Sequence, residues 1–265
     1  MVFGKQVRLN RITEKGKMLC IPMDHGVTIG PVKGLDKIFD TIEKVSLGGA
    51  TAILAQKGIL RTMPKPLNVG TILHISASTS LGPSPNFKVR VSGVEEALRL
   101  GADAVSVHVN IGCSDEPKML RKLGMLADEC DEWQVPFIAM MYPRGENIKN
   151  PNDPDIAAHV ARIGAELGAD IIKTPYIGNP ETFRKVVDGC PVPIVIAGGP
   201  KAESDLEVLK MVKEAMDAGA IGAAIGRNVF QHDNPFAITK ALKAIIIDGY
   251  TVKEALEVLK DVSTK

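Results

Sequence analysis

Lys173 is the residue whose type and position most directly suggest covalent chemistry. It follows the apolar segment 170–172, so a β-strand there would point its amine into the protein interior. Loss of solvent lowers the pKa of a lysine and frees its lone pair to attack a carbonyl, which forms a Schiff base. On position alone, a lysine paired with Asp24 or Asp103, or one that extends outward to solvent, is an equally good interpretation.

Two further side chains could move protons for such chemistry. Tyr142 ends another apolar segment, and Asp24 follows a third. Schiff-base cleavage needs a proton relay, which a phenol beside a lysine can provide, and a carboxylate can accept the proton of a substrate hydroxyl. Taken alone, Asp24 is weak support, because an aspartate at the end of a strand often caps the following loop.

Two glycine-rich segments are suited to bind phosphate. Gly198-Gly199-Pro200 and Gly226-Arg227-Asn228 each follow a short apolar segment and precede a helical pattern. Glycines let backbone N–H groups approach an oxyanion at a helix N-terminus, and an arginine adds a forked donor. Tight turns alone would also explain the glycines, but two such loops with an arginine favour phosphate binding. Lys201 could assist, or it could be a solvated lysine.

His25, His74 and His108 also lie near the ends of predicted strands. Such histidines could gather into a zinc site for metal-assisted aldol chemistry. No H-E-x-x-H or other tight ligand spacing supports this, so we predict hydrogen-bonding roles and no metal. The Ser/Pro/Gly-rich segment 76–88 could close over the site, or it could be an ordinary surface loop.

These residues fall at regular places in a repeating pattern of strands and helices. Near-continuous apolar segments that alternate with helical stretches indicate a parallel sheet covered by helices. Eight such units predict one (β/α)₈ barrel, a single domain over residues 1–265 in which residues 1–17 cap the bottom. A doubly wound sheet would need an early G-x-G-x-x-G turn, which is absent. The predicted strands are 18–24, 51–55, 71–75, 104–109, 136–141, 170–173, 194–197 and 221–225.

Capping residues predict where several of the helices begin. Asp153-Pro154 and Gly168 would bound one helix. Ser114, Asn179-Pro180 and Asn234-Pro235 would open others. The interval between the second and third strands is too short for a full helix.

The composition restricts the class of protein. Among 265 residues, 32 Lys and Arg balance 31 Asp and Glu, and the net charge of +1 argues against nucleic-acid or anionic-membrane partners. The four cysteines include no C-x-x-C pair, which indicates buried thiols in a reduced compartment. No segment reaches the roughly 18 apolar residues of a membrane span. We therefore expect a cytoplasmic protein.

The chain resembles the archaeal-type class I aldolases over nearly its whole length. The motifs that carry this resemblance occur in the same order as in that family and are Pro22-Met23-Asp24-His25-Gly26, Met141-Tyr142-Pro143-Arg144-Gly145, Lys173, Gly198-Gly199-Pro200-Lys201 and Gly226 to Gln231.

The resemblance implies a role for each matching residue. Lys173 would be the Schiff-base lysine, Tyr142 the proton donor and Asp24 the proton acceptor. The family needs no cofactor and forms a homodecamer, so a homo-oligomer is expected. The implied substrate and phosphate contacts are Asp24, His25, Gly26, Val27, Thr28, Tyr142, Pro143, Arg144, Gly198, Gly199, Gly226 and Arg227.

Within the family, the segments 138–141 and 230–233 are most similar to a transaldolase branch. That branch transfers a hydroxyacetone unit from the phosphosugar 6-deoxy-5-ketofructose 1-phosphate to L-aspartate semialdehyde. It releases hydroxypyruvaldehyde phosphate and begins the archaeal route to 3-dehydroquinate and the aromatic amino acids. The alternative is a fructose-1,6-bisphosphate aldolase, which tends to carry tryptophan where this chain has Met140. A phosphosugar isomerase or phosphosugar-binding protein is more remote.

Overall fold

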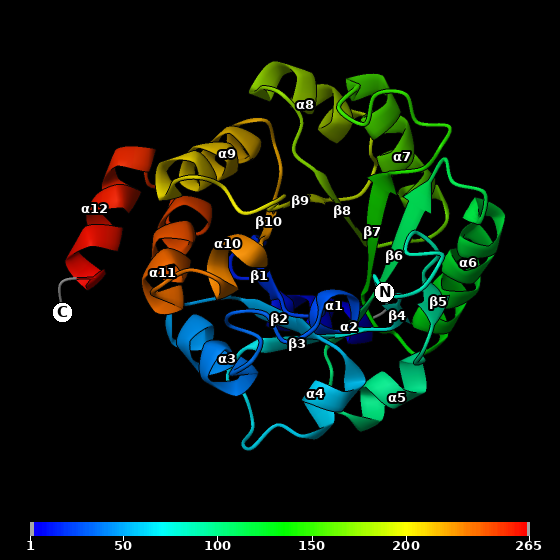
Figure 1. Ribbon diagram of the computed structural model, residues 1–265, viewed down its shortest axis with the longest axis horizontal. Coiled ribbons are helices and arrows are strands. Elements are labelled where there is room, and N and C mark those ends of the chain that lie inside the picture. The colour runs from blue at the N-terminus through cyan, green and yellow to red at the C-terminus, as the bar shows by residue number, and fades with distance from the viewer. Residues whose placement is uncertain (1–2, 264–265) are drawn as a thin grey trace.

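Eight parallel strands close into a barrel in the computed structural model, which describes residues 3–263 (Figure 1). Hydrogen-bonded neighbours run β1-β10-β9-β8-β7-β6-β3-β2 and back to β1. Each predicted strand segment overlaps one of them, so the (β/α)₈ prediction is confirmed. The strands are β1 (Met18–Pro22), β2 (Ala52–Ala55), β3 (Gly70–His74), β6 (Ala104–Ile111), β7 (Phe137–Pro143), β8 (Ile171–Pro175), β9 (Ile194–Ala197) and β10 (Gly222–Ala224).

Helices form an outer ring around these strands (Figure 1). The helix between β2 and β3 is α4, which has five residues, in agreement with the short interval in the sequence. The helices are α1 (Phe3–Ile12), α2 (Gly26–Ile29), α3 (Ile38–Leu47), α4 (Lys57–Arg61), α5 (Val94–Arg99), α6 (Glu116–Glu132), α7 (Pro154–Glu166), α8 (Pro180–Asp188), α9 (Asp205–Asp217), α10 (Arg227–Phe230), α11 (Pro235–Ile246) and α12 (Val252–Ser263).

Three of the four predicted helix caps are confirmed. The side chains of Asp153, Asn179 and Asn234 accept hydrogen bonds from the first backbone N–H groups of α7, α8 and α11. The prediction that Ser114 caps the next helix is wrong. Asp115 precedes α6 without a side-chain cap, and the carboxylate of Glu116 instead reaches back to the backbone N–H of Gly112.

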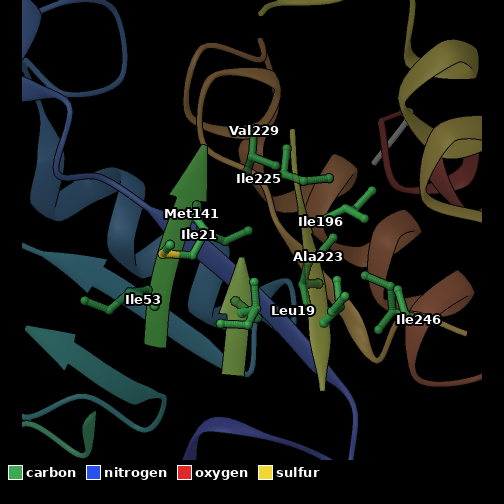
Figure 2. Packing of buried hydrophobic residues seen from close by; sticks show 14 of the residues in the cluster. Leu19, Ile21, Ile53, Met141, Ile196, Ala223, Ile225, Val229 and Ile246 are labelled. Atoms are coloured by element: carbon green, nitrogen blue, oxygen red, sulfur yellow. The ribbon is translucent and has the colours of Figure 1, made fainter. Parts of the chain in front are cut away.

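Side chains that point alternately to the two faces of each strand divide the core into two layers, one under the helices and one inside the barrel. Leu19 and Ile21 of β1 point outward and pack under the helices, together with residues such as Ile246 of α11 (Figure 2). Met18 and Cys20 of the same strand point into the barrel, where they meet inward residues of the other strands. Because successive side chains of a strand point to opposite faces, the period of two fixes what faces the barrel interior.

Helix α1 covers the N-terminal ends of the strands. Ile12 belongs to the apolar cluster inside the barrel, and its carbonyl accepts a hydrogen bond from Thr51 Oγ1 at 2.8 Å. Arg11 Nε lies 2.5 Å from Asp103 Oδ1, and Lys5 Nζ lies 3.1 Å from Asp170 Oδ1. Residues 1–2 of the predicted cap lie outside the described residues.

A hairpin lies between β3 and α5. Strands β4 (Ser76–Ala77) and β5 (Val89–Arg90) pair in antiparallel fashion and join the two ends of segment 76–88. Ser80 Oγ donates a hydrogen bond to the carbonyl of Thr28, and Thr28 Oγ1 donates one to the carbonyl of Ser78. These bonds tie the segment to α2 at the rim of the barrel.

The cysteines are buried, as the sequence predicts, and unpaired within residues 3–263. Burial raises the pKa of both Cys20 and Cys130 to about 12, so neither thiol offers a reactive thiolate near neutral pH. None of the helices in this range has the length and apolar character needed to cross a bilayer.

Candidate active site

A cavity of about 840 Å³ opens at the C-terminal end of the barrel. This is the end at which barrel enzymes carry out their chemistry. Every barrel strand, or the loop directly after it, contributes to the wall. In strand order from β1 these residues are Asp24, Gln56, His74, His108, Tyr142, Lys173, Gly198 and Gly226.

Lys173 reaches the cavity because of the alternation along β8. Ile171 faces the barrel interior and Ile172 faces the helices, so the next residue faces inward again. Only 5% of Lys173 is exposed, and its amine makes no ion pair with any residue of the described range. Pairing with Asp103 is wrong, because Asp103 lies at the opposite end of the barrel and binds Arg11.

Asp24 is held as a carboxylate between two histidines. Its oxygens lie 3.7 Å from His74 Nε2 and 3.5 Å from His25 Nδ1. Burial acts to raise the pKa of Asp24, but His74, His25 and Lys173 together lower it to about 2. Asp24 is therefore ionised at neutral pH and can accept a proton from a substrate.

The histidines make hydrogen bonds to neighbouring polar side chains. His74 is fixed by Ser106 and Ser76, whose hydroxyl oxygens lie 2.8 Å and 3.1 Å from its ring nitrogens. Burial lowers the pKa of His74 to about 4 and that of His108 well below its usual range. Both rings are therefore neutral at pH 7.

The predicted histidines do not gather into a metal-binding group. No set of three or more His, Cys, Asp and Glu side chains within residues 3–263 is arranged to hold a metal ion. His108 Nε2 instead lies 2.8 Å from Asn110 Oδ1. The buried Nδ1 of His25 lacks a hydrogen-bond partner in this range. It could bind a substrate hydroxyl.

Tyr142 stands on the strand beside Lys173. It follows Ile138 and Met140 on the inward face of β7, and Met140 is the strand neighbour of Lys173. The Tyr142 ring packs on His108 with centroids 4.7 Å apart, and the guanidinium carbon of Arg144 lies 5.3 Å from its centroid. The Tyr142 ring thus contacts both His108 and Arg144 within the same cavity.

The two glycine-rich loops are held together by Asn228. Its amide nitrogen donates to the carbonyls of Gly198 at 2.8 Å and Pro200 at 3.0 Å. Arg227 Nη2 donates to the carbonyl of Gly199 at 2.9 Å. A Cβ atom on Gly226 would lie 2.8 Å from the carbonyl oxygen of Pro22, so this turn needs glycine. The structure thus joins the two predicted phosphate loops into one wall.

The structure brings most of the predicted substrate contacts to this cavity. Gly26 and Pro143 are the two that do not line it: Gly26 begins α2, and Pro143 is buried at the end of β7. Lys201 lies at the wall and donates to the carbonyl of Gln231 at 3.3 Å.

Lys88 also lines the cavity and was not predicted from the sequence. It is 8% exposed and ends the segment 76–88. A signal was available, because Lys88 is the only charged residue in that segment.

Comparisons with known proteins place the chain among aldolases. A relative from Halobacterium salinarum, named 2-amino-3,7-dideoxy-D-threo-hept-6-ulosonate synthase, is 45% identical and covers 96% of this chain and 95% of its own length. A relative from Streptomyces griseus, named 2-amino-4,5-dihydroxy-6-oxo-7-(phosphonooxy)heptanoate synthase, is 39% identical, with coverages of 94% and 92%.

A solved structure and a family model agree with these relatives. The structure, described as a Schiff-base-forming fructose-1,6-bisphosphate aldolase, has a TM-score of 0.85 and 32% identity, and the match covers 91% of this chain and 99% of that one. The model of the DeoC/LacD family aldolases matches residues 18–232, which include every barrel strand. The chain therefore belongs to the DeoC/LacD aldolase family.

Proposed function

We propose that this protein is a class I transaldolase that performs the reaction named for its Halobacterium relative, 2-amino-3,7-dideoxy-D-threo-hept-6-ulosonate synthesis. It would transfer a hydroxyacetone unit from 6-deoxy-5-ketofructose 1-phosphate to L-aspartate semialdehyde. The observation that carries the proposal is the buried Lys173 amine, which faces a cavity shared with Tyr142 and the Asp24 carboxylate.

The first half of the reaction forms and breaks bonds at the donor. The Lys173 amine attacks the ketone beside the methyl group, and loss of water gives an iminium ion that acts as an electron sink. Asp24 accepts the proton of the hydroxyl at the scissile bond. The carbon–carbon bond breaks, its electron pair enters the iminium to form an enamine, and hydroxypyruvaldehyde phosphate leaves.

The second half reverses these steps with a different aldehyde. The enamine carbon attacks the aldehyde of L-aspartate semialdehyde, and the new alkoxide takes a proton. Water then hydrolyses the iminium and releases the seven-carbon product and free Lys173. Tyr142 would donate the proton needed as the carbinolamine loses water. The reaction needs no metal or organic cofactor, because the lysine itself supplies the electron sink.

The remaining walls of the cavity would bind the substrate. The glycine loops after β9 and β10 present backbone N–H groups and Arg227, which suit an oxyanion of the phosphosugar. The predicted contacts that line the cavity here, Asp24, His25, Val27, Thr28, Tyr142 and Arg144, would contact the two substrates. Asn228 would act as a positioning residue, because its bonds hold the two loops at a fixed separation.

The names of the two relatives support the acceptor. Both products are seven-carbon acids with an amino group at carbon 2 and a carbonyl at carbon 6, and only one carries a phosphate on carbon 7. The shared carbons 1 to 4 correspond to L-aspartate semialdehyde. Donors can differ between such enzymes while the amino-aldehyde acceptor stays the same.

The family resemblance also supports an assembly. We propose a single domain over residues 1–265, with residues 1–17 as its cap, that forms a homodecamer. Light scattering on the purified protein would give ten chain masses under this proposal, and a monomeric mass would contradict it.

Assays with two substrate pairs test the proposed reaction. We expect faster cleavage of 6-deoxy-5-ketofructose 1-phosphate, with transfer to L-aspartate semialdehyde, than of fructose 1,6-bisphosphate. The opposite order would favour the fructose-bisphosphate aldolase alternative. Activity that disappears with a chelator but survives Lys173→Ala would contradict the Schiff-base mechanism.

A further inference from the structure

Two cationic side chains lie at the cavity on the side away from the glycine loops. Lys88 comes from the segment after β3 and donates a hydrogen bond to Ser78 Oγ. Arg144 follows β7 and lies against the Tyr142 ring. Both line the cavity, and within residues 3–263 neither makes an ion pair with a carboxylate.

Holding these cations close together is unfavourable in the free protein. Lys88 is 8% exposed, and the group that its amine binds is the hydroxyl of Ser78, which carries no charge. Burial, followed by the charge of Arg144, lowers the pKa of Lys88. A third cation, Lys122, donates to the backbone carbonyl of Lys88. Lys88 is buried without a carboxylate partner in the described range, whereas Arg144 is exposed at the same cavity. Buried charges are normally paired, so the position of Lys88 is typical of a site that binds an anion.

The nearest carboxylate does not neutralise this group. Asp24 acts on Lys88 only through space, and its oxygens lie beside His74 and His25. An anionic ligand would therefore gain from both Lys88 and Arg144 without competing with a fixed partner. Arginine also presents a planar fork that matches the two oxygens of a carboxylate.

We propose that Lys88 and Arg144 form the subsite that binds the α-carboxylate of the acceptor aldehyde. This inference rests on the proposed function, because it assumes that the acceptor is an amino acid semialdehyde. It adds a specificity-determining residue, Lys88, and assigns to Arg144 a particular part of the substrate.

The size of the acceptor places its carboxylate within this cavity. Three carbon–carbon bonds of about 1.5 Å separate the aldehyde carbon from the carboxyl carbon, so the two lie at most about 4 Å apart. The carboxylate must then bind close to the reacting groups. Arg144 lies against the Tyr142 ring, and Lys88 lines the same cavity as Asp24, so both cations share the cavity with the proton-transfer residues.

Two acceptors that differ only in the carboxylate test this subsite. The variant Lys88→Met would be assayed with L-aspartate semialdehyde and with 3-aminopropanal, which lacks the carboxylate. We expect kcat/KM to fall by about ten- to a hundredfold with the first and by less than about threefold with the second, the range for losing a hydrogen bond to a charged group. Lys88→Arg keeps the charge and should recover most of the loss.

A matched lysine elsewhere serves as the control. Lys65 is exposed and pairs with Glu43 at 2.6 Å, remote from the cavity, so Lys65→Met should leave both assays unchanged. Equal losses with the two acceptors in Lys88→Met would overturn the assignment. A loss confined to cleavage of the donor alone would mean that Lys88 binds the donor phosphate, which also contradicts it.

A binding measurement separates this inference from the proposed reaction. L-Homoserine is the alcohol that corresponds to L-aspartate semialdehyde, and it cannot react with the enamine. Calorimetry should show at least tenfold weaker binding of L-homoserine to Lys88→Met than to the natural protein, and equal affinities would contradict the subsite. If the natural protein binds L-homoserine through Lys88 but forms no seven-carbon product, the proposed reaction fails and the carboxylate subsite stands.

Discussion

The two ends of the barrel differ in whether the charged residues described below have a partner of opposite charge. At the N-terminal end, Arg11 and Lys5 of α1 bind Asp103 and Asp170, which precede the strands β6 and β8. At the C-terminal end, Lys173 lies in the cavity with no carboxylate partner in the described range. Paired charges close one end, and unpaired charges at the other end are available to a substrate.

Each strand contributes to both ends through side chains on the same face. Ile171 belongs to the apolar layer inside the barrel, and Lys173, two residues later, lies in the cavity. Ile72 and His74 of β3 repeat this arrangement. Two residues of a strand span about 6.6 Å, so apolar packing and chemistry are one layer apart. Substitutions at the two ends should therefore affect different properties of the protein.

The largest expected effect is the loss of activity in Lys173→Met. Without the amine no imine forms, and we expect kcat/KM to fall by about 10⁴-fold or more. The melting temperature should stay the same or rise, because an apolar side chain replaces a buried amine that has no carboxylate partner in the described range. Lys5→Met at the other end should instead keep the activity. More than a few per cent residual activity in Lys173→Met would contradict the assignment.

Tyr142→Phe should lower kcat by about 10²- to 10⁴-fold, the range for the loss of a general acid. The ring contacts with His108 and Arg144 are kept by phenylalanine, so KM and the melting temperature should change little. Tyr250→Phe provides a control on an exposed tyrosine. An unchanged kcat in Tyr142→Phe would remove the phenol from the proton relay.

Acidification should destabilise the cavity end through His74. Burial lowers the pKa of His74 from 6.5 to about 4. Between these two pH values, His74 is protonated in the unfolded chain but neutral in the folded protein. The free energy of unfolding is then undiminished above pH 6.5 and falls as the pH drops towards 4, on the order of 3 kcal/mol from this group. Chemical denaturation at several pH values would show a shallower decline in His74→Gln. The same slope in both proteins would contradict the effect.

Asp103→Asn should give the smallest change, and at the opposite end of the barrel. It weakens the pair with Arg11 and the hydrogen bond that Asp103 accepts from the Thr71 N–H group. We expect a loss of about 1–3 kcal/mol in the free energy of unfolding with kcat unchanged. A loss of kcat without a loss of stability would show that the two ends are not separate.

The barrel and most of the site followed from local patterns in the sequence. Near-continuous apolar segments such as 170–173 predicted the strands, and the position of Lys173 at the end of its segment predicted its place in the cavity. Proline and asparagine at the starts of α8 and α11 marked those helices correctly. These features depend on neighbours close in the chain, which a sequence displays directly.

The features that the sequence did not predict depend on contacts between distant segments. Lys88 reaches the cavity because β4 and β5 pair and because Thr28 and Ser80 tie the segment to the rim. Asn228 bridges two loops about 30 residues apart in the chain. Ser114 failed as a cap because α6 begins at Glu116, which puts Asp115 and not Ser114 at the N-cap position. Such choices depend on packing in three dimensions.

Reduction of the trapped imine tests the central claim most directly. The protein would be mixed with 6-deoxy-5-ketofructose 1-phosphate, treated with sodium borohydride and mapped by peptide mass spectrometry. Our account predicts one stable adduct on Lys173 and none in Lys173→Met. An adduct on another lysine, or none at all under conditions in which the donor is cleaved, would contradict it.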